Sequence, residues 1–122
     1  MKYLVTGGAG FIGSHIVSAL LEQGASVRVL DNFSTGRREN IEALTGQFGR
    51  DRLEILEGDV RDASRVGEAV RGVEVIFHEA AFVSVPQSMD EPQECFDVNL
   101  TGTSLLLDAA RRAGVRRAVV AS

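Results

Sequence analysis

The stretch YLVTGGAGFIGSH, residues 3–15, decides the fold of this chain. A short apolar run leads into three glycines, Gly7, Gly10 and Gly13, and an amphipathic stretch follows directly. This order predicts a buried strand, a tight turn and the start of a helix. Such a turn suits a dinucleotide pyrophosphate, because a helix N-terminus offers unpaired amide groups and a positive dipole end. A glycine triplet alone is a weak signal, so its weight depends on the rest of the chain.

Strand-like and helix-like segments alternate after this turn. We expect strands over 2–6, 27–31, 53–57, 73–78 and 117–121, and helices over 11–23, 39–45, 63–70 and 93–113. The first helix is expected to point Ile12, Ile16, Ala19, Leu20 and Gln23 inward. The alternation predicts an α/β fold: a Rossmann-type doubly wound parallel sheet with strand order 3-2-1-4-5 and helices on both faces.

In such sheets the ligand crevice lies at the carboxyl ends of the strands, where the strand order reverses. The predicted strands end in residues that are polar or glycine: Thr6-Gly7, Asp31, Asp59, His78-Glu79 and Ser122. Their clustering supports a ligand site independently of the glycine turn.

Asp31 is placed to bind the ribose of an adenosine. It lies 21 residues beyond Gly10 at a strand end, where a carboxylate accepts hydrogen bonds from both ribose hydroxyls. The same charge repels a 2′-phosphate, so NAD is favoured over NADP. Arg37 and Arg38 are the feature that favours NADP, but they lie six and seven residues past Asp31. The alternative is a structural glycine turn, with Asp31 only terminating its strand.

The three glycines have separate predicted roles. Gly7 permits the tight turn, Gly10 lets the backbone approach the pyrophosphate, and Gly13 allows close packing of helix on strand. Asp59 and Val60 are placed to meet the adenine edge. The alternative for Asp59 is a turn cap between Gly58 and Arg61.

Composition limits the class of protein. The chain has 122 residues, a net charge of −4 and one cysteine, Cys95. These values predict one domain, no nucleic-acid or membrane partner and no internal disulfide. No apolar run approaches the roughly 18 residues of a membrane span, and no signal peptide is evident, so we expect a cytoplasmic protein. The sequence contains no recognisable pattern of metal ligands, so no metal site is predicted.

Several motifs in order resemble the extended short-chain dehydrogenases/reductases, the group of NAD-dependent nucleotide-sugar epimerases and dehydratases. Besides TGGAGFIG at 6–13, the matching segments are LDNFSTG at 30–36, EGDVRD at 57–62, HEAA at 78–81, VSVP at 83–86 and NLTGT at 99–103. The likeness spans the whole chain and is greatest to the UDP-glucose and UDP-N-acetylglucosamine 4-epimerases.

The resemblance implies a set of NAD contacts. Phe11 and Ile12 would meet the pyrophosphate, and Asp31 and Asn32 the adenosine ribose. Further contacts would come from loop and helix residues: Ser34, Thr35 and Gly36 at the nearby phosphate or ribose, Asp59 and Val60 at adenine, Ala80, Ala81 and Val83 along the nicotinamide ribose, and Asn99 near the cofactor. Ser84 would touch the sugar substrate, or else is an ordinary loop hydroxyl. Members often have a lysine where this chain has Val83.

The resemblance also implies which catalytic groups to look for. In this family a tyrosine removes the sugar hydroxyl proton, assisted by a lysine four residues later and by a serine or threonine. Tyr3 is the single tyrosine, and residue 7 is glycine. Ser122 aligns one residue before the catalytic serine. We therefore expect the NAD-binding domain (1–122) of a longer UDP-hexose 4-epimerase, without its substrate-binding lobe and inactive alone.

Two alternatives stay open on the sequence. One is the cofactor module of a nucleotide-sugar dehydratase or decarboxylase, and the other is a stand-alone, non-catalytic NAD-binding protein. In the expected fold the fifth strand is an exposed edge, which predicts low stability or self-association, with a homodimer as one form.

Overall fold

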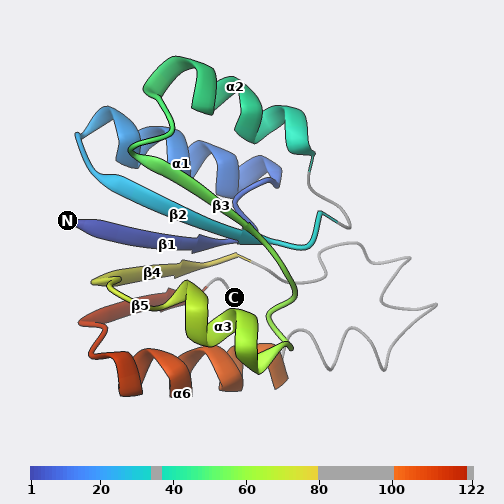
Figure 1. The fold of residues 1–122 in the computed structure, drawn as a ribbon, viewed down its shortest axis with the longest axis vertical. Coiled ribbons are helices and arrows are strands. Elements are labelled where there is room, and N and C mark those ends of the chain that lie inside the picture. The colour runs from blue at the N-terminus through green and yellow to red at the C-terminus, as the bar shows by residue number, and fades with distance from the viewer. Residues whose placement is uncertain (34–36, 80–100, 121–122) are drawn as a thin grey trace.

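A computed structural model describes residues 1–33, 37–79 and 101–120 of the chain. Figure 1 shows one sheet between two layers of helices. The elements in chain order are β1 (Lys2–Thr6), α1 (Phe11–Glu22), β2 (Ser26–Asp31), α2 (Arg38–Phe48), β3 (Leu53–Glu57), α3 (Ala63–Ala69), β4 (Val75–His78), α6 (Thr103–Ala113) and β5 (Arg117–Val120).

The five strands form one parallel sheet in the order β3-β2-β1-β4-β5. This confirms the predicted doubly wound topology. The order reverses between β1 and β4, so the crevice of such a sheet lies beyond the carboxyl ends of these strands. In Figure 1, α1 and α2 cover one face of the sheet, and α3 and α6 cover the other.

The α1/α2 face has an apolar core, and its helix face differs from the predicted one. The buried residues of α1 are Gly13, Val17, Leu20 and Leu21. Ile12, Ala19 and Gln23 are exposed, so these three inward predictions were wrong. The cause is the glycine, because α1 approaches the glycine turn most closely at Gly13 and buries the residues four, seven and eight positions later.

The α3/α6 face buries Leu4, Leu30 and Ile76 from the sheet against Val66 of α3 and Leu106 of α6. Asp62 caps α3, and its carboxylate accepts hydrogen bonds from the backbone N–H groups of residues 64 and 65. The cap fixes the start of α3, which follows the carboxyl end of β3.

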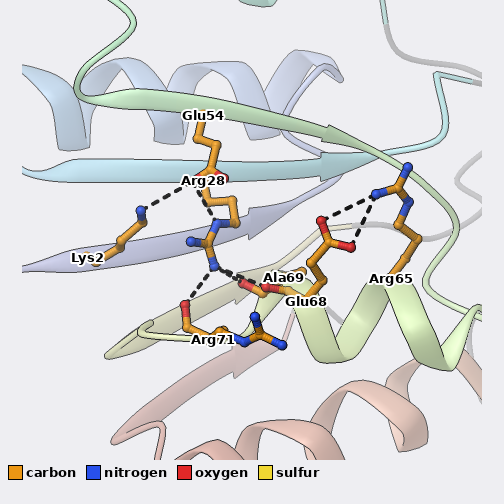
Figure 2. Close-up of polar contacts among 7 residues, drawn as sticks. All are labelled: Lys2, Arg28, Glu54, Arg65, Glu68, Ala69 and Arg71. Atoms are coloured by element: carbon orange, nitrogen blue, oxygen red, sulfur yellow. Dashed lines mark hydrogen bonds and ion pairs between the residues drawn. The ribbon is translucent and has the colours of Figure 1, made fainter.

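Arg28 of β2 holds the other end of α3 (Figure 2). Its Nη1 donates to the carbonyl oxygens of Ala69 (2.7 Å), Arg71 (2.8 Å) and Glu68 (3.3 Å). Its Nε donates to Glu54 of β3 at 3.0 Å. Burial alone would raise the pKa of the Glu54 carboxyl, but the hydrogen bonds and charges of Arg28 and of Lys2 outweigh burial and lower it. The guanidinium is therefore both a C-terminal cap of α3 and a bridge to β3.

Some element bounds differ from the predicted ones. The second helix ends at Phe48, three residues later than expected, because the Phe48 ring packs on the α1/α2 core and lies under Arg52. The fourth strand begins at Val75, since Val73 is buried in the turn before it. Within 93–113, the described helix is α6. At the sheet edge, Val119 and Val120 of β5 are each 44% exposed.

Candidate functional site

The glycine turn joins β1 to α1 at the carboxyl edge of the sheet. Gly7 has φ 71°, a left-handed conformation that favours glycine, and its carbonyl accepts a hydrogen bond from the Gly10 N–H at 3.1 Å. No side chain of the described residues caps α1 at Gly10, and the first turn has no acidic residue. Phe11 and Ile12 are 78% and 61% exposed. The N-terminus of α1 is therefore an accessible set of amide donors for an anion.

The turn is too tight for side chains at two of its glycines. A Cβ at Gly13 would lie 2.1 Å from the Gly7 carbonyl oxygen, so α1 packs directly on the turn, as the spacing predicts. A Cβ at Gly8 would lie 2.8 Å from the Val29 methyl groups of β2. The predicted roles of Gly7, Gly10 and Gly13 do not include this second requirement, although the pair Gly7-Gly8 is visible in the sequence. At Gly10 a Cβ would be 3.4 Å from the same carbonyl, so contacts within the protein do not require glycine there.

Asp31 ties the glycine turn to the end of β2. Its Oδ2 accepts the Ala9 N–H at 2.9 Å, and its Oδ1 accepts the Phe33 N–H at 2.7 Å. Asp31 is only 8% exposed, and Phe33 has φ 59°, a strained conformation for a bulky residue. A carboxylate has about four acceptor positions, so about two remain beyond these two amides.

A groove of about 550 Å³ opens between Phe33 and the start of α2. Arg38 lies on its wall, with its guanidinium carbon 4.2 Å from the centroid of the Phe33 ring and an ion pair to Glu57. The Asn40 amide donates to the Ala9 carbonyl at 2.9 Å, so α2 is also tied to the glycine turn. The lining residues are Phe33, Arg37, Arg38, Glu39 and Asn40.

Asp59 follows β3 and is held by Arg61. The guanidinium donates from Nε to Oδ1 (3.0 Å) and from Nη2 to Oδ2 (2.7 Å), and the Arg61 N–H donates to Oδ1 (2.8 Å). These bonds, opposed by partial burial and helped by the side chain of Asn32, hold the pKa of the Asp59 carboxyl below its usual value. The carboxylate is thus ionised and fixed in orientation.

A buried polar chain crosses the carboxyl edge from β1 to α6. His78 of β4 contacts the Thr6 hydroxyl through Nδ1 (2.5 Å) and the Thr103 hydroxyl through Nε2 (2.9 Å), and the Glu79 N–H donates to Thr6 Oγ1 (3.0 Å). His78 is 4% exposed, and burial lowers its pKa. Its imidazole is therefore neutral at pH 7 and positions β1 against α6.

The structure thus brings Gly7, Gly10, Asp31, Asn32 and Asp59 to one edge of the sheet, and the Gly58 N–H links their loops by donating to the Asp31 carbonyl (3.0 Å). Val60 is buried behind them. The other predicted contacts lie outside the described residues: Ser34, Thr35, Gly36, Ala80, Ala81, Val83, Ser84, Asn99 and Ser122.

In the described ranges, no helix has both the length and the apolar character to cross a membrane. The same ranges contain no group of three or more His, Cys, Asp or Glu side chains arranged to hold a metal ion.

A doubly wound sheet with this glycine turn and a carboxylate ending β2 defines a dinucleotide-binding α/β protein. Residues 3–122 match the NAD dependent epimerase/dehydratase family, and the chain belongs to that family. The family is named for NAD, and this chain contains the family's Rossmann-type cofactor fold.

Relatives agree with this assignment. UDP-glucose 4-epimerase of Mycolicibacterium smegmatis is 45% identical over 120 residues, covering 98% of this chain and 37% of the relative. The chain thus spans little more than a third of that relative's length, although it covers 88% of a Klebsiella pneumoniae UDP-glucose 4-epimerase at 37% identity.

Solved structures are also similar. UDP-glucose 4-epimerase of Stenotrophomonas maltophila, with bound NAD and formylated UDP-arabinopyranose, matches with a TM-score of 0.91 and 34% identity over 100% of this chain and 37% of that one. The dTDP-glucose 4,6-dehydratase DesIV of Streptomyces venezuelae, with NAD bound, matches with a TM-score of 0.88 and 39% identity over 97% and 38%. Epimerases and dehydratases therefore share this cofactor fold.

Proposed function

We propose that the glycine turn, Asp31 and Asp59 bind NAD along the carboxyl edge of the sheet. The observation that carries the proposal is the Asp31 carboxylate, which is bonded to the Ala9 N–H of the glycine turn at 2.9 Å. This bond holds the Asp31 carboxylate close to the accessible N-terminus of α1. In an adenosine diphosphate the ribose and the pyrophosphate are adjacent, which supports one ligand for both groups.

Each part of the site has one task in this proposal. The amide groups of Phe11 and Ile12 bind the pyrophosphate. Asp31 and Asn32 form hydrogen bonds with the ribose hydroxyls. Asp59 and the Val60 backbone hold adenine. The residues outside the described ranges keep their proposed roles: Ser34, Thr35 and Gly36 near the phosphates, Ala80, Ala81, Val83 and Asn99 near the nicotinamide ribose, and Ser84 near the sugar. NAD, when bound, accepts and returns a hydride.

NAD is favoured over NADP by charge and by the state of the nearby arginines. A 2′-phosphate would lie next to the ionised Asp31. Arg38 is already paired with Glu57 and stacked on Phe33, so its charge is balanced within the protein. Arg37 is exposed, and its backbone N–H is bonded to the Ala9 carbonyl.

For the reaction, we propose that these residues serve as the cofactor-binding part of a UDP-hexose 4-epimerase, with a UDP-sugar as substrate partner. The epimerase relatives support this choice. The dehydratase neighbour supports the second candidate, a 4,6-dehydratase of a nucleotide sugar. A cytoplasmic location fits the single cysteine in 122 residues. Pairing of two chains through β5 is supported by its exposed edge.

Titration calorimetry with NAD and NADP tests the cofactor. The wild-type chain is expected to bind NAD more tightly than NADP, and Asp31→Asn is expected to lose this preference. Asp51→Asn is the matched control, because it makes the same chemical change at an exposed residue in the turn before β3. Absence of NAD binding, or tighter binding of NADP, would refute the proposal.

A turnover assay tests the role in the reaction. The 122 residues contain one tyrosine, Tyr3, which lies in β1 and stacks on Phe77 with ring centroids 6.0 Å apart. They contain no Tyr-x-x-x-Lys pair. The chain alone is therefore expected not to convert UDP-glucose to UDP-galactose while it still binds NAD. Turnover by the chain would contradict the proposed division of roles.

A further inference from the structure

We infer that Arg61 is a positioning residue that makes the nucleotide site select a base with an exocyclic amino group. It acts by holding the Asp59 carboxylate in one orientation. The inference rests on the proposed NAD function and goes beyond it, since it assigns base selectivity to a side chain that does not itself contact the base.

The first observation is the geometry of the Arg61–Asp59 pair. Two guanidinium nitrogens meet the two carboxylate oxygens at 3.0 and 2.7 Å, and the Arg61 backbone N–H adds a third bond at 2.8 Å. Side-chain exposures of 33% and 27% keep much of this pair away from water. A bidentate pair fixes the plane of a carboxylate, whereas one ammonium group leaves it free to rotate.

The second observation is the donor already on the remaining position of Asp59. The Asn32 side chain hydrogen-bonds this carboxylate from the loop that follows β2. A carboxylate has about four acceptor positions, of which Arg61 uses three. Asn32 thus fills the remaining position from the ribose side, and an amide NH₂ fits there. The amino group of adenine is a donor of the same kind, and in our inference it takes this position when the nucleotide binds, while Asn32 turns to the ribose.

The third observation is that the ribose and base loops are fixed to each other. The Gly58 N–H donates to the Asp31 carbonyl at 3.0 Å, so Asp59 follows directly on a residue bonded to the ribose aspartate. Val60 is 4% exposed, and a Cβ at Gly102 would lie 2.5 Å from its methyl group, so the backbone beyond Asp59 is closely packed. A base attached to the ribose at Asp31 is therefore presented to the Asp59 carboxylate.

The chemical consequence is discrimination at position 6 of the purine. An amino group donates to the fixed carboxylate, while the keto oxygen of hypoxanthine meets it as a second acceptor. A hydrogen bond to a charged group contributes about 1.5–3 kcal/mol, which corresponds to about tenfold or more in affinity. With Arg61 shortened, the carboxylate turns away and this discrimination falls.

Calorimetry with NAD and with nicotinamide hypoxanthine dinucleotide tests the inference. Wild type is expected to prefer NAD by about tenfold or more, and Arg61→Lys to reduce that preference at least about fivefold. Asp59→Asn is expected to reduce it similarly. Arg111→Lys is the matched control, since Arg111 pairs with Asp108 on α6 at 77% exposure, and it is expected to keep the wild-type preference.

The outcomes separate the two proposals. If wild type fails to bind NAD, the proposed function falls and this inference falls with it. If wild type binds NAD but Arg61→Lys keeps the full preference for NAD, only this inference is overturned. That holds even if Asp59→Asn loses the preference. Because the readout is a ratio of two affinities within one variant, a general loss of stability does not imitate the expected result.

Discussion

The two faces of the sheet differ in how closely their helices approach it. The α1/α2 face has apolar side chains and a close backbone contact, where α1 meets the glycine turn at Gly13, and Asn40 and Arg52 add side-chain hydrogen bonds. On the α3/α6 face, polar side chains also bind distant segments, namely Arg28 on the end of α3 and His78 between β1 and α6. Hydrogen bonds thus help to hold both faces, and the close backbone fit at Gly13 distinguishes the face that carries the glycine turn.

The largest expected effect is on the α1/α2 face. Gly13→Ala places a Cβ against three backbone atoms of the turn at 2.1–2.9 Å, so α1 has to move. We expect a loss of about 3 kcal/mol or more in the free energy of unfolding, measured by urea denaturation.

The matched control is Gly67→Ala in α3, on the opposite face. A Cβ there meets nothing within 4 Å, so the variant is expected to gain up to about 1 kcal/mol from helix propensity. Equal stability of the two variants would show that close packing at Gly13 does not hold the α1/α2 face.

The second effect concerns the α3/α6 face. Arg28→Ala removes a side chain that is 12% exposed, takes the Arg28 donor from the Ala69 and Arg71 carbonyls, and leaves Glu54 with Lys2 but without Arg28. We expect a loss of about 2 kcal/mol in the same urea experiment.

Arg65→Ala provides the comparison within Figure 2, because Arg65 is 43% exposed and pairs only with the side chain of Glu68 among the bonds drawn there. Its removal is expected to change stability by less than about 0.5 kcal/mol. A similar loss in both variants would mean that capping by Arg28 contributes nothing beyond a surface ion pair.

The smallest effect is a pH dependence from His78. Burial lowers its pKa in the folded state, so the unfolded chain binds the proton more readily near pH 6. The contribution of His78 to the free energy of unfolding is therefore fully present above the unfolded pKa of about 6.5. It is lost as the pH falls below that value. His78→Asn is expected to flatten this slope between pH 7 and pH 5.

Two carboxyls with lowered pKa values, Glu54 and Asp59, do not obscure the pH dependence from His78. Their contribution to the free energy of unfolding is lost only below about pH 4.5. Urea midpoints at several pH values provide the measurement. An unchanged slope in His78→Asn would assign the pH dependence to other groups.

The sequence predicted the sheet order and the carboxylate of β2, because both follow from local patterns. Glycine spacing and apolar runs are read within a few residues, and strand alternation leaves few topologies. The inward face of α1 was predicted wrongly because apolar periodicity favours Ile12, and not Gly13, as a residue that faces the core. A residue without a side chain carries no hydropathy signal, yet it sets the closest approach.

The polar links of the α3/α6 face could not be predicted in the same way. Arg28 bonds to carbonyls 40–43 residues away, and His78 to Thr103, 25 residues on. Nothing local distinguishes these residues from exposed ones. The Asp59–Arg61 pair could have been predicted from the sequence, since two residues separated by one position can form a turn and an ion pair together.

The bond between Asp31 and the glycine turn limits how this site can be re-engineered. Under the proposed function, a change of cofactor preference toward NADP calls for replacing the Asp31 carboxylate with a neutral or basic side chain. That replacement also weakens or removes the acceptor of the Ala9 and Phe33 amides, the second of which belongs to a residue with positive φ. A successful redesign therefore has to supply a new acceptor for those two amides before it adds a phosphate-binding charge.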